Sequence, residues 1–297
     1  MTEKLNPTQA LFSKFGMQNV SPVQLVDRGE CDISLGDVRL RKSDLFWVCQ
    51  TLSSGFNASG IFDDAISADG TLEYVLRFYE EYLPSVPDEM RGKLGSTSDG
   101  GLLCNWLLLH YVRPSSYIES GVFIGASLRL ADAAFPEIEK WAYDLSFRPL
   151  LYKNEDITYI QNDFSKELPS LPNGVVSFSF FDDHIDPVRR ILECHRAGIE
   201  WVLFDDSPTF PRLNRYRYPA VPSVSMIMDD DMPDGFCVEW NHPNEERVLR
   251  YTHDREYCQS ARNLVIGHVD MRNLMGNVGV TCGDKVVVRL KKSDGSQ

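Results

Sequence analysis

Residues 116–134, with the sequence SYIESGVFIGASLRLADAA, combine a short strand, a tight turn and a helix. We predict a strand at Ser116–Ser120, with the acidic residue Glu119 at its end, and a helix at Gly125–Ala134. Gly121 permits a close backbone approach to a ligand, and the free amides that open the helix favour an anionic or polar ligand. An ordinary strand–helix turn explains the glycines equally well. The spacing differs from the GxGxxG fingerprint of dinucleotide sites, because a Phe-Ile pair separates the glycines.

Strand and helix signals alternate along the rest of this half of the chain. Single helices between the strands predict an α/β fold, a doubly wound, Rossmann-like and mostly parallel sheet. Such a sheet binds ligands at the carboxyl ends of its strands. Further strands are predicted at residues 139–143, 157–160, 175–181 and 201–204, and further helices at 102–112 and 187–197. A C-terminal antiparallel hairpin at 278–290, with Gly-Asp at its turn, would complete one edge of the sheet.

The first 95 residues follow a different pattern. A short hairpin at 33–40 and a helix at 72–82 predict an N-terminal α+β extension. We divide the chain into a cap or oligomerisation segment, residues 1–95, and a Rossmann-like domain, residues 96–297. The Gly- and Ser-rich loop that joins them is expected to approach the ligand pocket as a mobile edge.

Two acidic residues follow the second and third predicted strands. Asp144 lies 25 positions after Glu119, where an acid can accept hydrogen bonds from ribose hydroxyls; a helix N-cap is the ordinary alternative. Asp163, in Asn-Asp-Phe, either contacts an adenine ring or serves as a turn residue.

The fourth and fifth predicted strands each end in a pair of aspartates. Asp182 and Asp183 follow one, and Asp205 and Asp206 follow the next. Carboxylates this close are costly unless a cation, a proton or hydrogen-bond donors compensate them, and hard cations such as Mg²⁺ prefer oxygen ligands. We therefore predict a divalent-metal site formed by these four aspartates. The alternative for each pair is one helix cap and one solvated side chain.

His184 follows the first pair directly. It is either a general base, with Asp182 as the second candidate catalytic residue, or a structural hydrogen-bonding group. Other basic residues are less informative. The arginines of the 187–197 helix, Arg189, Arg190 and Arg196, are expected on a solvated face. The run Arg212–Arg217 either binds an anionic or sugar-containing substrate or forms a surface loop.

The composition restricts the class of protein. Asp and Glu number 43 against 30 Lys and Arg, giving a formal net charge of −13, so nucleic acid and anionic membranes are not expected partners. The seven cysteines are scattered without CxxC spacing, as is typical of reduced thiols. The N-terminus lacks the pattern of a secretory signal, and we expect a soluble cytoplasmic protein.

Taken together, the motifs Glu-x-Gly-x-x-x-Gly-x-Ser, Asp144, Asn-Asp-Phe and the two strand-end Asp pairs resemble class I S-adenosylmethionine-dependent methyltransferases. The similarity is greatest to small-molecule O-methyltransferases of the branch that includes cephalosporin-hydroxylase-like and sugar-modifying members. It covers residues 102–206. The resemblance implies that Asp144 holds the cofactor's ribose and that Asp163 lies near its adenine. It also implies that the methionine side of the cofactor is lined by Glu119, Gly121, Gly125 and Ser127.

The resemblance further implies a divalent cation on Asp182, Asp205 and Asp206, as in metal-dependent members. Two departures stand out: Ala126 replaces the usual second glycine, and the doubled Asp182-Asp183 leaves the ligand choice open. His184 fits a metal-free, base-driven enzyme instead.

Three functions are consistent with these residues. The first is methyl transfer from S-adenosylmethionine to a hydroxyl of a small molecule or glycan, assisted by Mg²⁺ or Mn²⁺. The second is a catalytically silent binding or assembly protein, because a fold alone never proves activity. The third is a nicotinamide-dependent oxidoreductase, which the glycine spacing disfavours. A homo-oligomer is compatible with all three.

Overall fold

The computed structural model describes residues 33–35, 38–40, 42–91, 97–172, 174–216 and 219–293. The expected reduced state of Cys31, the side chain of Arg217 and most of the loop predicted before residue 97 lie outside these ranges.

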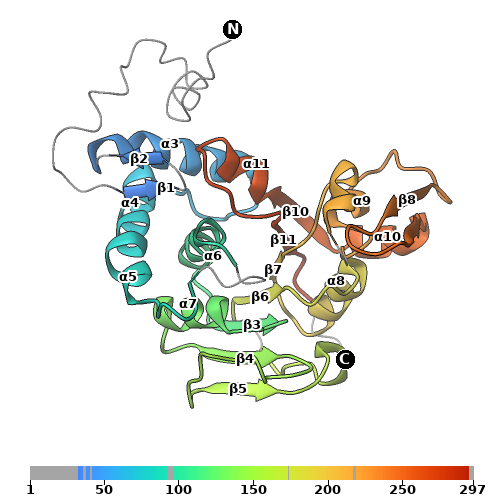
Figure 1. The fold of residues 1–297 in the computed structure, drawn as a ribbon, viewed down its shortest axis with the longest axis horizontal. Helices are drawn as coiled ribbons and strands as arrows, with labels where there is room; N and C mark the ends of the chain where they lie inside the picture. Colours follow the sequence, from blue (N-terminus) through green and yellow to red (C-terminus); the bar gives the residue numbers. More distant parts are fainter. Residues whose placement is uncertain are drawn as a thin grey trace, which may run out of the picture.

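A seven-stranded sheet forms the centre of the molecule (Figure 1). Five adjacent strands, which reach one edge of the sheet, are parallel, and the last strand in the described part of the chain is antiparallel to both of its neighbours. The order across the sheet is β10 (Val265–Asp270), β11 (Val286–Leu290), β7 (Trp201–Phe204), β6 (Ser177–Phe181), β3 (Ser116–Ser120), β4 (Glu139–Tyr143) and β5 (Ile157–Ile160). The predicted doubly wound sheet is confirmed. The order reverses between β3 and β6, and this switch point is where open α/β sheets form a ligand crevice.

Helices cover both faces of the sheet. Along β7, Trp201 and Leu203 pack into one hydrophobic core while Val202 and Phe204 pack into another, as the two-residue period of a strand requires. The first core includes α3 (Lys42–Ser59), α4 (Ala68–Arg77), α6 (Asp99–Val112), α7 (Ala126–Ala134) and α11 (Met271–Gly276). The second includes α8 (Pro187–Arg196), α9 (Val224–Ile227) and α10 (Arg255–Arg262).

The N-terminal α+β extension is also confirmed. β1 (Ile33–Leu35) and β2 (Val38–Leu40) form the predicted antiparallel hairpin. The predicted helix is longer than expected, because α4 continues through a π-helical turn, η1 (Phe78–Tyr82), into α5 (Leu83–Ser85). Its apolar residues share the core of the sheet's first face with α6. The domain boundary near residue 95 remains a prediction.

The C-terminal antiparallel pair exists, but its first strand was placed wrongly. It is β10, and not residues 278–281, that pairs with β11. The stretch before β11 instead contains the buried Asp284. Its carboxylate accepts hydrogen bonds from Arg212, Tyr216 and Arg272. The apparent Gly-Asp turn is therefore an ion-pair centre. A second hairpin, β8 (Cys237–Asn241) with β9 (Val248–Thr252), had no expected counterpart.

No helix in the described part of the chain combines the length and the apolar character that crossing a bilayer requires.

The buried histidine of α6 gives a testable pH dependence. His110 is 5% exposed, stacks between aromatic rings and shares a hydrogen bond of 2.8 Å between Nδ1 and the carbonyl of Trp106. Burial lowers its pKa from 6.5 to about 4. Between these values the unfolded chain binds a proton that the folded chain does not, so the free energy of unfolding falls as pH falls.

We expect His110→Phe to remove this contribution, which is on the order of 3 kcal/mol across that interval. Urea denaturation of both proteins from pH 7 to pH 4 measures the difference in slope. Parallel curves would show that the pKa of His110 is the same in the folded and the unfolded chain.

Candidate functional site

A cavity of about 770 Å³ lies at the carboxyl ends of the parallel strands. This volume is within the roughly 300–1,000 Å³ typical of small-molecule sites. Its walls come from the segments that follow β3, β4, β5, β6 and β7, together with the loop before β11. Thr97 and Ser98 also line it, so the part of the predicted loop that the structure describes does reach the pocket.

The turn after β3 packs directly against the turn after β6. Gly121 has φ +86°, and a Cβ built there would lie 2.3 Å from the carbonyl oxygen of Asp182. Only glycine fits both the left-handed conformation and the space. Gly125 has φ +84° and precedes α7, and its own Cβ would lie 2.9 Å from Leu150 Cδ1. The two glycines therefore allow close packing, and Gly121 itself lines the cavity.

Three of the residues predicted around the cofactor's methionine are not among those that line the cavity: Glu119, Gly125 and Ser127. Glu119 is 1% exposed and accepts a 2.7 Å hydrogen bond from the Tyr117 hydroxyl. Burial raises the pKa of Glu119 to about 8. These residues support the wall from behind, and their contact with a ligand remains a prediction.

Asp144, at the end of β4, holds the turn after β3. Its carboxylate accepts hydrogen bonds from the amides of Val122 at 2.9 Å, Phe123 at 3.1 Å and Ser146 at 2.9 Å. The N-cap alternative is not what the structure contains. A carboxylate has about four acceptor positions, so one remains for a ligand in the cavity that Asp144 lines.

Arg190 joins the acids after β5 and β6. Its guanidinium contacts Asp163 at 3.1 Å, Asp183 at 2.8 Å and Glu193 at 2.6 Å. Although burial opposes it, the hydrogen bond from Arg190 lowers the pKa of Asp163 far below its usual range. Asp183 also accepts a 2.6 Å hydrogen bond from the Ser120 hydroxyl. Our expectation that Arg190 faces solvent was wrong, since it is fully buried.

Lys285 plays a similar part beside β7. Its ammonium pairs with Asp205, and its side chain is 1% exposed. Arg190 and Lys285 thus each form an ion pair with one aspartate of a strand-end pair.

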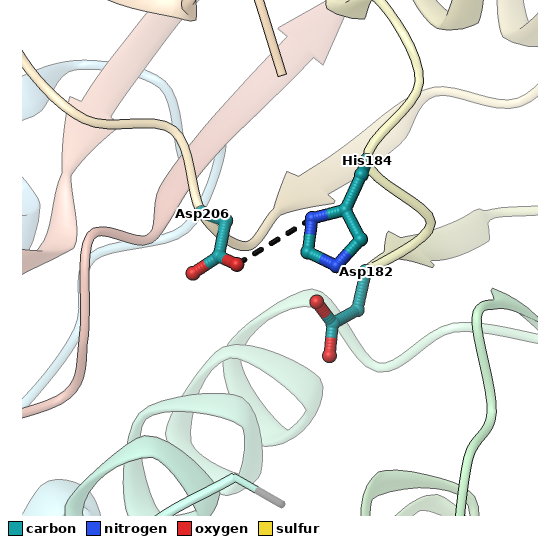
Figure 2. A group of neighbouring side chains, drawn as sticks. All are labelled: Asp182, His184 and Asp206. Atoms are coloured by element: carbon teal, nitrogen blue, oxygen red, sulfur yellow. Dashed lines mark ion pairs between the residues drawn. The ribbon is translucent and has the colours of Figure 1, made fainter. Parts of the chain in front are cut away.

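The remaining acids face the cavity with His184. Ligand atoms of Asp182, His184 and Asp206 lie within 4.8 Å of one another. Figure 2 shows the His184 ring beside both carboxylates, with Nδ1 3.5 Å from Asp206 Oδ2. His184 has φ +56° and Asp206 has φ +47°. Such strained conformations in non-glycine residues cluster at functional sites.

Neither of these two carboxyl groups forms an ion pair with a lysine or arginine in the described part of the chain, although the charge of Lys285 acts on both. Within the described ranges, no side chain donates a hydrogen bond or forms an ion pair with the Asp182 carboxylate, and Asp206 has only His184. Burial and then the charge of Asp205 raise the pKa of Asp182 well above its ordinary value. The same two causes raise the pKa of Asp206 to about 6. A bound cation would relieve both costs.

The predicted metal-ligand set is therefore rearranged. The structure brings together Asp182, Asp206 and His184, and it pairs Asp183 and Asp205 with basic side chains instead. In the run for which substrate binding and a surface loop were the two alternatives, Arg212 contacts Asp284 at 3.0 Å and does not line the cavity.

Comparisons with known proteins give solved structures of methyltransferases. A cmcI structure with Mg and SAM has 16% identity over 64% of this chain and 70% of that chain, with a TM-score of 0.39. An SAH-bound methyltransferase from Podospora anserina has 12% identity over 98% of this chain and 99% of that chain, with a TM-score of 0.36. The mitomycin 7-O-methyltransferase has 12% identity over 66% of this chain and 55% of that chain, with a TM-score of 0.32. No model of a protein family matches the sequence, and no curated protein matches it.

Within the sheet, β11 lies antiparallel between β7 and β10, next to the five parallel strands. The chain has a Rossmann-like fold, with a mostly parallel sheet covered by helices on both faces.

Proposed function

We propose that the protein transfers a methyl group from S-adenosylmethionine to a hydroxyl of a small molecule or glycan. One observation carries the proposal: at the switch point of the sheet, Asp144 fixes the glycine turn after β3 through two amides and keeps an acceptor position toward the cavity. This is where a nucleoside's ribose hydroxyls would bind.

The neighbouring residues fit the rest of an adenosyl group. Leu145 is 75% exposed and Phe123 is 37% exposed, and both line the cavity. Leu145 follows Asp144 in the sequence, and the amide of Phe123 donates a hydrogen bond to the Asp144 carboxylate. A bound adenine would cover this apolar surface, with Asn162 and Asp163 at its polar edge. The excess of carboxylates around the cavity favours a cofactor that carries a positive sulfonium. When bound, that cofactor supplies an electrophilic methyl group.

The chain's own residues provide two ways to activate the acceptor. Asp182, His184 and Asp206 would hold Mg²⁺ or Mn²⁺, whose positive charge lowers the pKa of a bound hydroxyl. Without a metal, His184, oriented by Asp206, would accept the hydroxyl proton itself. The carboxylates of Asp182 and Asp206, which form no ion pair with a lysine or arginine in the described residues, support the metal-assisted route.

Substituting Asp144 tests the cofactor site. We expect Asp144→Ala to weaken binding of S-adenosylhomocysteine at least about tenfold, because the ribose loses a charged acceptor and the turn loses its anchor. Calorimetric titration measures the change. Asp156→Ala serves as the control, since Asp156 is exposed and precedes β5 on the amino side of the sheet. Equal affinities in the two variants would contradict the assignment of Asp144.

A further inference from the structure

Lys285 occupies an unusual place for a lysine, at the floor of an acidic cavity. It immediately precedes β11, and the pairing of Val286 with Phe204 sets it opposite Asp205. Its ammonium pairs with Asp205 and lies 4.6 Å from the centroid of the Phe180 ring. A Cβ on Gly101 would lie 3.3 Å from Lys285 Cε, so the α6 N-terminus closes over the side chain. The side chain is held in one position.

All four strand-end aspartates line the cavity, and one member of each pair forms an ion pair with a basic residue. Asp183 forms an ion pair with Arg190, and Asp205 forms an ion pair with Lys285. Asp182 and Asp206 are left to meet His184 across the cavity. Both unpaired carboxylates are one residue away in sequence from a paired one.

We propose that Lys285 is a positioning residue that decides which carboxylates bind the metal. Its ion pair with Asp205 keeps that carboxylate from coordinating the metal, so that Asp182, His184 and Asp206 form a site for a single divalent ion. The inference rests on the metal-binding part of the proposed function.

Charge and geometry both support this role. A fixed ammonium beside Asp205 repels a second cation and offsets the negative charge of that carboxylate. Without Lys285, three of the four carboxylates would be free, and they would bind a cation more tightly or bind two. With Lys285 present, only two are free. The lysine therefore limits both the number and the affinity of bound ions.

Manganese titration of the full-length protein tests the proposal, with free Mn²⁺ followed by electron paramagnetic resonance. Lys285→Gln should bind Mn²⁺ at least about tenfold more tightly than wild type, or bind a second ion, because one repulsive charge is gone and Asp205 is released. Lys285→Gln/Asp205→Asn should return to the wild-type affinity and a single ion. Asp206→Asn should lose binding.

Lys140→Gln is the matched control, because Lys140 is also fully buried and pairs with an aspartate, Asp132, at 3.0 Å, but does not line the cavity. It reports what loss of a buried ion pair does to stability alone, and its Mn²⁺ affinity should match wild type. Thermal melting identifies variants that fail to fold. The double variant, which removes both charges of the Lys285–Asp205 ion pair together, remains informative if Lys285→Gln unfolds.

Three results would overturn the inference. One is an unchanged Mn²⁺ affinity and stoichiometry in folded Lys285→Gln. Another is loss of binding in the double variant, which would make Asp205 a ligand. A third is the absence of Mn²⁺ binding in wild type and Lys285→Gln alike, which would also remove the metal from the proposed function. Titration with S-adenosylhomocysteine in the absence of metal separates these outcomes from failure of the methyltransferase proposal.

Discussion

Arg190→Met is expected to destabilise the protein by about 3–5 kcal/mol, since removal of one partner from a buried ion-pair network leaves uncompensated charges. The guanidinium is fully buried and contacts Asp163, Asp183 and Glu193. It also packs over the rings of Phe164 and Phe181 at 5.5 and 5.4 Å. Urea denaturation at pH 7 measures the loss.

The adjacent arginine of α8 provides the control. Arg189 is 44% exposed and pairs with Glu193 at 2.9 Å, so Arg189→Met should cost less than about 1 kcal/mol. Similar losses in the two variants would mean that the buried network is not what stabilises this edge of the sheet. Because Arg190 ties the segments after β5 and β6 together, folded Arg190→Met should also bind S-adenosylhomocysteine more weakly.

Gly121→Ala is expected to reduce the affinity for S-adenosylhomocysteine at least about a hundredfold, since displacements near 1 Å at a binding centre have effects of this size. The new Cβ would lie 2.3 Å from a backbone oxygen of Asp182. Backbone atoms cannot rotate away as a side chain can, so the turns after β3 and β6 must separate. A larger residue such as valine would disturb both turns further.

Gly198→Ala separates this effect from conformational strain. Gly198 has φ +74°, close to that of Gly121, but nothing lies within 4 Å of its Cβ position. Both variants should lose about 1–2 kcal/mol of stability from the left-handed conformation alone. Only Gly121→Ala should lose ligand affinity, as measured by calorimetry. Retention of wild-type affinity in Gly121→Ala would show that this turn does not shape the ligand site.

Local sequence was sufficient to locate the sheet. Strands such as Ser177–Phe181 and Trp201–Phe204 are apolar runs bounded by turn residues, and both faces of these strands are buried. Their acidic ends had to meet at one edge because the strands are parallel. The predicted positions of Asp182 and Asp206 at the cavity follow from this geometry.

The pairing of charges depends on contacts that short motifs do not specify. Arg190 is aligned on α8 with Pro187, Ile191 and Cys194, at the spacing of a buried helical face, and this signal could have revealed its burial. Lys285 meets Asp205 only because β11 inserts antiparallel beside β7. The partner of β11 on its other side is β10, which precedes in sequence the hairpin expected from Gly-Asp. Long-range strand order, and not local pattern, therefore determines which acids remain free.

The central claim is that the cavity at the switch point binds S-adenosylmethionine. Calorimetric titration of the wild-type protein with S-adenosylmethionine and, separately, with NAD⁺ tests it most directly. We predict saturable binding of one S-adenosylmethionine per chain, abolished or strongly weakened in Gly121→Ala, and no binding of NAD⁺. Binding of NAD⁺ without S-adenosylmethionine would identify a nicotinamide enzyme, and binding of neither would indicate a catalytically silent protein; either result would contradict the claim.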